Sequence, residues 1–252
     1  MKNVMDFSGK TIVLAGAGGI GAATAELLAS LGARMILLDV VEEKLKETVA
    51  RLPGDGHAYY VCDFSTVESI EPLMAQMIQE QGPVDGYVHT TGIGAVRPLK
   101  MSKYNFMLRV MNINFFSFVE VVRCLTKKAA NNPGMNIVGI SAVGAFIGNS
   151  TKTAYCASKS AMNSAVRCLA KELAPKGIRL NTVAPGATDT PMAREAADYR
   201  DGTEEQRVNA LRQYMGTCQP ADIADSVAFL LSDMSRMITG ICLPVDGGKL
   251  SS

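Results

Sequence analysis

Short apolar runs alternate with longer segments of helical periodicity from one end of the chain to the other. Apolar runs bounded by glycine, proline or polar clusters are typical of strands that are buried on both faces. The predicted strands are 11–15, 35–38, 58–62, 84–89, 136–140, 178–184 and 241–245. The predicted helices are the segment from the glycine turn to residue 31, then 42–52, 66–81, 102–130, 153–173 and 220–231. This alternation predicts an α/β fold with a doubly wound, parallel seven-stranded sheet, as a single domain over residues 1–252.

Two of the predicted helices have surfaces that one chain does not obviously cover. The stretch 102–130 is apolar on nearly every side and includes Phe115, Phe116 and Phe118, while the helix 153–173 is rich in alanine and serine. A helix that is apolar all round must be covered on both faces, and large exposed apolar patches mark association sites. We therefore expect a homo-oligomer, a dimer or a tetramer, built on these two helices.

Composition narrows the classes of function. Hydrophobic residues make up 48% of the chain and charged residues 19%, the formal net charge is +1, and like charges form no run. Binding to nucleic acid or to a membrane surface is therefore not expected. No apolar run is long enough to span a bilayer, and no signal peptide fits the first residues. The six cysteines are scattered, which is typical of reduced thiols in a cytoplasmic protein. His57 and His89 lack metal-ligand spacing, so no metal site is expected.

One long connection interrupts the alternation of strands and helices. The segment 187–219 is polar, contains methionine and lies between the predicted sixth strand and the helix 220–231. Connections of this length in compact domains often form lids or binding loops. We therefore expect 187–219 to be a substrate loop.

The turn after the first strand has the spacing of a phosphate-binding loop. Gly16, Gly18 and Gly21 fit G-x-G-x-x-G, in which the glycines permit a tight turn, close approach of a pyrophosphate, and close helix–strand packing. The N–H groups around Ile20, where the helix begins, would face the phosphates. Asp39 ends the next strand, near the usual offset for a carboxylate that holds an adenosine ribose. The glycines alone also fit an ordinary strand-to-helix turn, but together with Asp39 they predict dinucleotide binding.

Tyr155 and Lys159 stand four residues apart on the helix that follows the fifth strand. Residues at this spacing share a helix face, so the ammonium can lie beside the phenol. A nearby cation stabilises phenolate and lowers the tyrosine pKa, which suits a general acid/base. The spacing by itself also fits a surface lysine next to a packed tyrosine, and only its position in the chain favours the catalytic interpretation.

The glycine turn, the Tyr-x-x-x-Lys pair after the fifth strand and Pro-Gly after the sixth together resemble the short-chain dehydrogenase/reductase family. The likeness covers nearly the whole chain, and the segment 238–248 looks like the ending of the branch that resembles 3-oxoacyl-carrier-protein reductases. The resemblance implies a Rossmann-like fold with strand order 3-2-1-4-5-6-7 and a site at the carboxyl ends of the strands. It also implies hydride transfer between a nicotinamide cofactor and a small-molecule carbonyl or secondary alcohol.

The resemblance carries residue roles over by position. Tyr155 would exchange a proton with the substrate oxygen, and Lys159 would lower the tyrosine pKa and hold the nicotinamide ribose. Asn114 matches the asparagine that supports a proton-relay water, although a polar residue bonded within a buried helix is the alternative. The other cofactor-binding residues would be Asp63 beside the adenine, Gly92 after the fourth strand, and Pro185, Gly186 and Thr190 beside the nicotinamide and pyrophosphate.

Three positions depart from the family pattern. The glycine loop 15–21 is one residue shorter than T-G-x-x-x-G-x-G, and 89–92 is H-T-T-G where N-N-A-G is usual. The catalytic serine lies thirteen residues before the tyrosine, and this position is Ala142, which cannot donate a hydrogen bond to the reacting oxygen. Ser141 is adjacent, but neighbouring strand residues point to opposite faces, so it could substitute only if the backbone rotates there.

The favoured interpretation is an NAD(P)-dependent oxidoreductase. Asp39 should accept hydrogen bonds from the ribose hydroxyls and repel a 2′-phosphate, and the next residues, Val40 and Val41, bring no positive charge. NAD(H) is therefore expected over NADP(H). The alternative is a weak or inactive relative that binds the dinucleotide as a sensor or assembly subunit. Tyr155, Lys159 and Asn114 argue for the enzyme, and Ala142 argues for the alternative.

Overall fold

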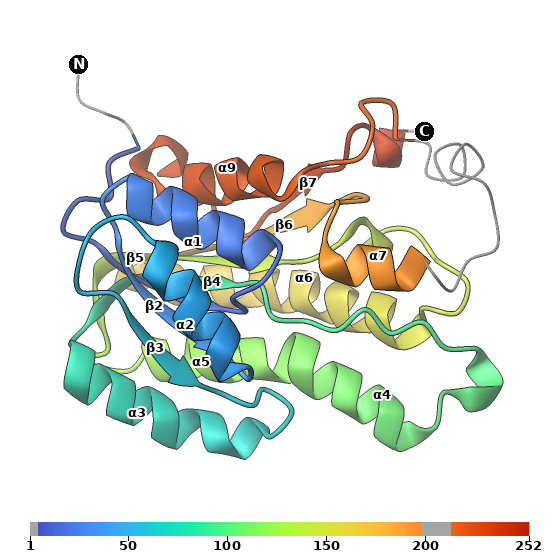
Figure 1. The fold of residues 1–252 in the computed structure, drawn as a ribbon, viewed down its shortest axis with the longest axis horizontal. Coiled ribbons are helices and arrows are strands. Elements are labelled where there is room, and N and C mark those ends of the chain that lie inside the picture. Colours follow the sequence, from blue (N-terminus) through green and yellow to red (C-terminus); the bar gives the residue numbers. More distant parts are fainter. Residues whose placement is uncertain (1–4, 198–212, 252) are drawn as a thin grey trace.

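A seven-stranded parallel sheet runs through the centre of the computed structural model, which describes residues 5–197 and 213–251 (Figure 1). The strand order is β3-β2-β1-β4-β5-β6-β7 and every pair is parallel. The strands are β1 (Thr11–Ala15), β2 (Arg34–Asp39), β3 (Ala58–Val61), β4 (Val84–His89), β5 (Asn131–Ile140), β6 (Arg179–Pro185) and β7 (Cys242–Val245). The predicted sheet and its strand order are confirmed.

Helices cover both faces of this sheet. The helices are α1 (Ile20–Ser30), α2 (Glu42–Arg51), α3 (Ile70–Gln81), α4 (Tyr104–Met111), α5 (Ser117–Leu125), α6 (Thr153–Leu173), α7 (Pro191–Ala197) and α9 (Pro220–Leu231). Among the described residues, no helix combines the length and apolar character needed to cross a membrane. Helices α1, α2 and α9 pack on one face, and α3, α5 and α6 pack on the other (Figure 1).

Two apolar cores lie on opposite sides of the sheet because strand side chains alternate in direction. Val13 and Ala15 of β1 belong to the core under α3, α5 and α6. Ile12 and Leu14 of the same strand belong to the core under α1, α2 and α9. Both sets are buried, which explains why the central strands are continuous apolar runs in the sequence.

The expected helix 102–130 is a composite of α4, a π-helical turn over Asn112–Phe116, and α5. Phe118 is fully buried within the chain, so the expectation that it needs cover from a second chain is wrong. Phe116 keeps 41% of its surface exposed. Phe116 and Phe118 are two residues apart, so they point to nearly opposite sides of the helix, and Phe118 faces the sheet while Phe116 faces outward.

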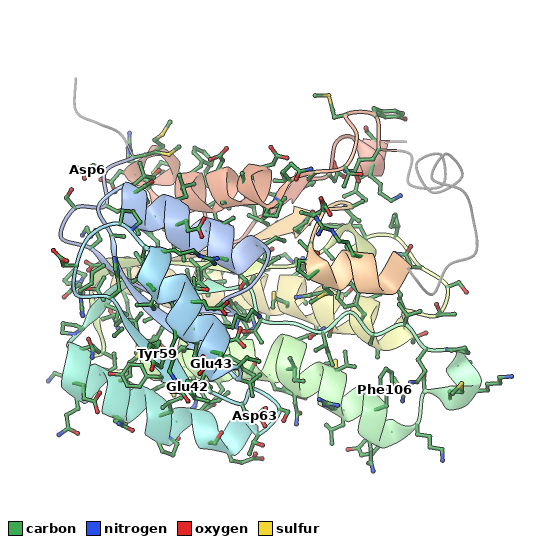
Figure 2. The ribbon with its side chains drawn as sticks, viewed as in Figure 1. Asp6, Glu42, Glu43, Tyr59, Asp63 and Phe106 are labelled. Atoms are coloured by element: carbon green, nitrogen blue, oxygen red, sulfur yellow. The ribbon has the colours of Figure 1, made fainter. Side chains whose placement is uncertain are left out.

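Charged side chains occupy the outer surface at the β3 edge of the sheet. Glu42 and Glu43 lie at the start of α2, and Tyr59 of β3 donates a hydrogen bond to Glu42 at 3.4 Å (Figure 2). Acidic residues in the first turn also complement the helix dipole. This edge is therefore polar and partly covered by α2, which disfavours pairing with another strand.

Two sequence expectations need adjustment. Strand β5 begins at Asn131 and not at residue 136, because Val84 pairs with Asn131 before a shift of register at Gly86. Of the expected substrate loop 187–219, residues 198–212 lie outside the described residues. Its described start contains α7, and Thr188 bridges to Cys218 at its far end.

We predict that Gly21→Ala destabilises the fold by about 3 kcal/mol, because a Cβ at this position would overlap the carbonyl oxygen of Gly16, which is backbone and cannot move aside cheaply. Chemical denaturation of the protein without cofactor measures this. Gly148→Ala is the matched control, since a Cβ there meets nothing within 4 Å. Equal unfolding free energies for the two variants would contradict the packing argument.

Candidate functional site

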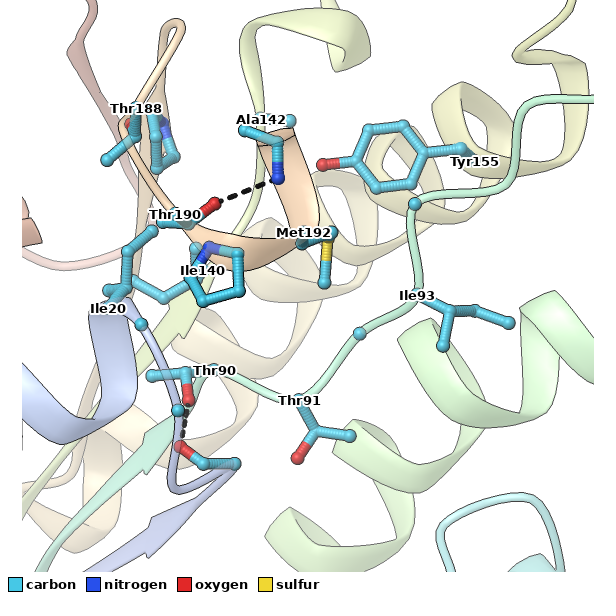
Figure 3. A pocket seen from close by; sticks show the side chains of 18 of the residues that line it. Ile20, Thr90, Thr91, Ile93, Ile140, Ala142, Tyr155, Thr188, Thr190 and Met192 are labelled. Carbon is cyan, nitrogen blue, oxygen red and sulfur yellow. Dashed lines mark hydrogen bonds between the residues drawn. The ribbon is translucent and has the colours of Figure 1, made fainter. Parts of the chain in front are cut away.

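A cavity of about 1150 Å³ opens at the carboxyl ends of the strands (Figure 3). In a doubly wound sheet this is the edge where ligands bind, beside the strand at which the order reverses. The strands on either side of that point are β1 and β4. The cavity brings together most of the residues expected from the sequence. Its lining includes Gly16, Gly18, Ile20, Asp39, Asp63, Gly92, Tyr155, Lys159, Pro185, Gly186 and Thr190.

Two expected residues lie behind this lining. Gly21 packs against the carbonyl of Gly16 at the start of α1, where no side chain fits. Asn114 is fully buried, in the π-helical turn. Its Oδ1 accepts a hydrogen bond from the backbone of Ile93 at 2.9 Å, and its Nδ2 donates to Ser158 Oγ at 3.0 Å. Asn114 therefore ties the loop after β4 to α6, and its side chain is not bonded within its own helix.

The glycine turn is held by three strands. Gly16 donates its N–H to Leu38 O at 2.7 Å, and Ala17 donates to Asp39 Oδ2 at 2.8 Å. Thr90 Oγ1 lies 2.8 Å from Ala15 O and 2.7 Å from Gly16 O. Gly16 has φ 95°, a conformation that favours glycine. The shortened loop is therefore a defined structure, and Thr90 supports it in the segment that departs from the family pattern.

The two carboxylates expected near the adenosine both lie at the cavity. Asp39 is 8% exposed, and its Oδ1 accepts a hydrogen bond from Val41 N at 3.1 Å. Asp63 accepts one from Ser65 N at 2.9 Å, and the hydrogen bonds from Ser65 lower the pKa of Asp63. Both groups sit at strand ends, where they can reach ribose or adenine atoms.

Tyr155 and Lys159 project from one face of α6 into the cavity, and Figure 3 shows the Tyr155 hydroxyl pointing toward Ala142. Lys159 is 3% exposed and donates from Nζ to Ile140 O at 2.7 Å. Burial lowers the pKa of Lys159 to about 8. Burial also raises the pKa of Tyr155 to about 12, so the lower tyrosine pKa expected from the Tyr–Lys spacing is absent in the protein without cofactor.

Ala142 lines the cavity where the family's serine would be, and Ser141 does not replace it. Ser141 also lines the cavity, but its side chain is buried and its hydroxyl donates to Lys159 O at 3.4 Å. Ala142 has φ −166° and ψ 156°, so the strand continues through it without a twist that would turn Ser141 inward. The expected alternation of strand side chains holds here.

Comparisons with known proteins agree with this geometry. The sequence model of a family described as enoyl-(acyl carrier protein) reductase matches residues 14–249. A 2,5-dichloro-2,5-cyclohexadiene-1,4-diol dehydrogenase of Sphingobium indicum is 32% identical over 249 residues, which cover 96% of this chain and 98% of that protein. A 3-oxoacyl-(acyl-carrier-protein) reductase of Thermotoga maritima is 32% identical over 248 residues, which cover 97% and 99%. The chain belongs to the short-chain dehydrogenase/reductase family.

Solved structures extend the likeness to the whole fold of this short-chain dehydrogenase/reductase. A dehydrogenase/reductase of Sinorhizobium meliloti superimposes with a TM-score of 0.87 at 29% identity, covering 98% of this chain and 97% of that one. An actinorhodin polyketide ketoreductase, solved with NADPH, superimposes with a TM-score of 0.85 at 28% identity, covering 95% and 97%. The protein is an oxidoreductase that uses a nicotinamide cofactor, and none of the relatives named here supports the inactive alternative.

The residues present fit such a cofactor in this short-chain dehydrogenase/reductase. Gly16 and Gly18 line the cavity and bring backbone to its wall, with the Lys44 side chain lying against Gly18. Asp39 and Asp63 supply acceptors at one end, and Tyr155 and Lys159 lie at the other. No group of three or more His, Cys, Asp or Glu that could hold a metal occurs in residues 5–197 and 213–251.

Sequence reasoning missed the charged residue that lies beside Asp39. Lys44 Nζ lies 3.3 Å from Asp39 Oδ2, so the expectation of an Asp39 without a neighbouring positive charge is wrong. The reason is helix geometry, because Lys44 is five residues away in sequence but lies on the side of α2 that faces the strand end. A lysine in the first turns of a helix that follows such an Asp is the signal that could have found it.

We predict that Lys159→Met stabilises the protein at pH 7 by about 1–3 kcal/mol. The substitution removes the free-energy cost of burying an ammonium group, and this gain is reduced by the loss of the hydrogen bond to Ile140 O. The pKa of Lys159 is about 8 in the folded protein and about 10.5 in the unfolded chain, so the unfolded chain binds more protons between these two pH values. Stability therefore rises with pH in that window, and the gain from the substitution fades toward pH 10.5.

Chemical denaturation from pH 7 to 10.5 tests this, with exposed Lys171 on the same helix as the control. Lys171→Met should change stability little and without this dependence on pH. A Lys159→Met protein that is no more stable than wild type at pH 7 would contradict the account.

Proposed function

We propose that this protein catalyses reversible hydride transfer between NAD(H) and a small-molecule carbonyl or secondary alcohol, with Tyr155 as the proton-exchanging group. The observation that carries the proposal is a single cavity lined by the glycine turn, by Asp39, and by the neighbouring Tyr155 and Lys159. A cavity with phosphate-binding backbone at one end and an acid/base pair at the other suits a dinucleotide whose reactive ring meets a substrate.

The adenosine half of the cofactor would lie along the β1–β2 side of the cavity. Backbone N–H groups at Gly18 and Ile20 would face the pyrophosphate at the start of α1. Asp39 would accept hydrogen bonds from the adenosine ribose, and Asp63 would lie beside the adenine. Gly92, Pro185, Gly186 and Thr190 would line the path toward the nicotinamide, which supplies or accepts the hydride when it is bound.

Tyr155 and Lys159 would handle the proton. In the reductive direction the carbonyl carbon receives the hydride, and Tyr155 Oη gives its proton to the carbonyl oxygen. The resulting phenolate is stabilised by the Lys159 ammonium and regains a proton from solvent. The high pKa of Tyr155 keeps the phenol protonated at neutral pH, which is the form that donates. Asn114 would support this pair by fixing the loop after β4, and it is the proposed third member of the catalytic group.

NAD(H) is the proposed cofactor because a carboxylate at the end of β2 favours a ribose with free hydroxyls over a 2′-phosphate. Val40 and Val41 add no charge beside it. The solved ketoreductase with NADPH shows that NADP(H) is used by a structural relative, so the preference is a property to be measured on this chain.

The substrate side of the cavity is proposed to include the described start of the loop 187–219. Thr190 and Met192 line the cavity there, and Met192 packs toward Gly94 across it (Figure 3). Methionine is an adaptable apolar lining. The names of relatives supply a first panel of substrates: a 3-oxoacyl thioester, a cyclic diol and an aldohexose. A cytoplasmic location remains a prediction from the sequence.

We predict that Ala142→Ser raises turnover on a shared carbonyl substrate by about a hundred- to a thousandfold, because it restores one hydrogen-bond donor to the reacting oxygen, typically worth ~2.7–4 kcal/mol. Tyr155→Phe should remove activity in either background. Ser141→Ala should change turnover little, since its hydroxyl faces Lys159 O. Steady-state rates measure all three, with NADH for the 3-oxoacyl thioester and with NAD⁺ for the diol and the aldohexose.

Rates for the wild type and these variants also distinguish an enzyme that lacks one hydrogen-bond donor at Ala142 from a dinucleotide-binding protein without activity. An unchanged rate for Ala142→Ser, together with an unharmed Ser141→Ala, would end the missing-donor account. Tight NADH binding with no turnover by wild type or by Ala142→Ser, on any member of the panel, would favour the sensor or assembly subunit.

We also propose a homo-oligomer formed through α4, α5 and α6, and predict a dimer or tetramer by light scattering at micromolar concentration. Tyr104, Leu108 and Phe116 are exposed apolar or aromatic residues along α4 and the π-helical turn. Burying such a row favours association at about 25 cal/mol per Å². Phe116→Glu should dissociate the assembly, and Met237→Glu, exposed on the loop after α9, is the control. A monomeric wild type would refute the proposal.

A further inference from the structure

Lys44, Asp39 and Gly18 form one small cluster at the adenosine end of the cavity. Lys44 Nζ lies 3.3 Å from Asp39 Oδ2, and all three residues line the cavity. A Cβ built at Gly18 would lie 2.5 Å from Lys44 Nζ, so the ammonium rests directly over the glycine turn. The side chain of Lys44 keeps 42% of its surface exposed, and that of Asp39 only 10%.

The Asp39 carboxylate is already engaged on both oxygens. Oδ2 accepts from Ala17 N at 2.8 Å and from Lys44, and Oδ1 accepts from Val41 N at 3.1 Å. A ribose that approaches this carboxylate therefore also meets an ammonium group. The local charge is close to neutral, and it is not the bare negative charge that would exclude a 2′-phosphate.

We propose that Lys44 is a specificity residue that admits NADP(H) to the site, by holding its ammonium between Asp39 and the 2′-phosphate of the adenosine ribose. The proposal rests on the proposed function, because it requires a nicotinamide dinucleotide in this cavity. Gly18 is part of the arrangement, since any side chain there would occupy the position of the ammonium. A flexible lysine can form either contact without a change of backbone.

The expected consequence is that the protein binds NADH only slightly more tightly than NADPH. Asp39 still favours a ribose with two free hydroxyls, but the ammonium removes most of the repulsion that a lone carboxylate exerts on phosphate. The wild type should bind NADPH within about tenfold of NADH. Charge-assisted hydrogen bonds to phosphate are among the strong ones, so loss of Lys44 should act mainly on NADPH.

Calorimetric titration of NADH and NADPH into the full-length protein tests this with three variants. Lys44→Met should raise the ratio of the NADPH to the NADH dissociation constant at least tenfold, and Lys44→Arg should keep the wild-type ratio. Lys46→Met is the matched control on the same helix, because Lys46 is exposed and pairs with Glu42 and Glu43 at the surface. It should leave the ratio unchanged. Thermal melts of each variant report whether it is folded.

An unchanged ratio in folded Lys44→Met would overturn the proposal. Equal weakening of both cofactors would also overturn it, because Lys44 would then contact a part that the two share. If Lys44→Met fails to fold, Lys44→Gln replaces it with the same expected result. Absence of binding of either cofactor to wild type would refute the proposed function as well, whereas NADH binding with a Lys44-independent ratio refutes only the role of Lys44.

Discussion

The site depends on the anchoring of the turn at Gly16 and Ala17 to three strands at once. Its backbone is bonded to Leu38 and Asp39 at the end of β2, and Thr90 at the end of β4 bonds to its carbonyls. Parallel register brings these strand ends to one edge, and the turn is where they are joined. Because Gly21 has no side chain, its backbone lies against the carbonyl oxygen of Gly16, and α1 can start close to the sheet. The cavity lies beside this turn, at the carboxyl ends of the strands.

At the other end of the cavity, the two ionisable groups of the proposed acid/base pair are buried. Lys159 is buried with one backbone acceptor, and Tyr155 carries a raised pKa because water is largely excluded. Such burial costs stability in the free protein. It leaves the ammonium with a backbone carbonyl and no acidic partner among the described residues around it, a pattern that is typical of functional sites.

The sequence predicted most of the fold because the central strands are buried on both faces and punctuated by glycine and proline. Strand order came from family resemblance, not from the pattern. Most predicted site residues line one cavity, since strand ends gather there. Lys44 was missed because contacts across a helix surface do not follow sequence adjacency. Phe118 was misjudged because a run that is apolar on every side does not show which of its residues face the sheet of the same chain. The direction of the Tyr155 pKa shift was misjudged because spacing along a helix does not report burial.

The π-helical turn at Asn112–Phe116 has a consequence for how this protein can vary. A π-helical turn takes up an extra residue within a helix and often marks a functional site. The segment before the turn meets α6 and the site, and the segment after it meets α3 and the sheet. The turn therefore separates a segment that faces the site from a segment that packs in the core, so substitutions in α4 that reshape the substrate side need not disturb the packing of α5.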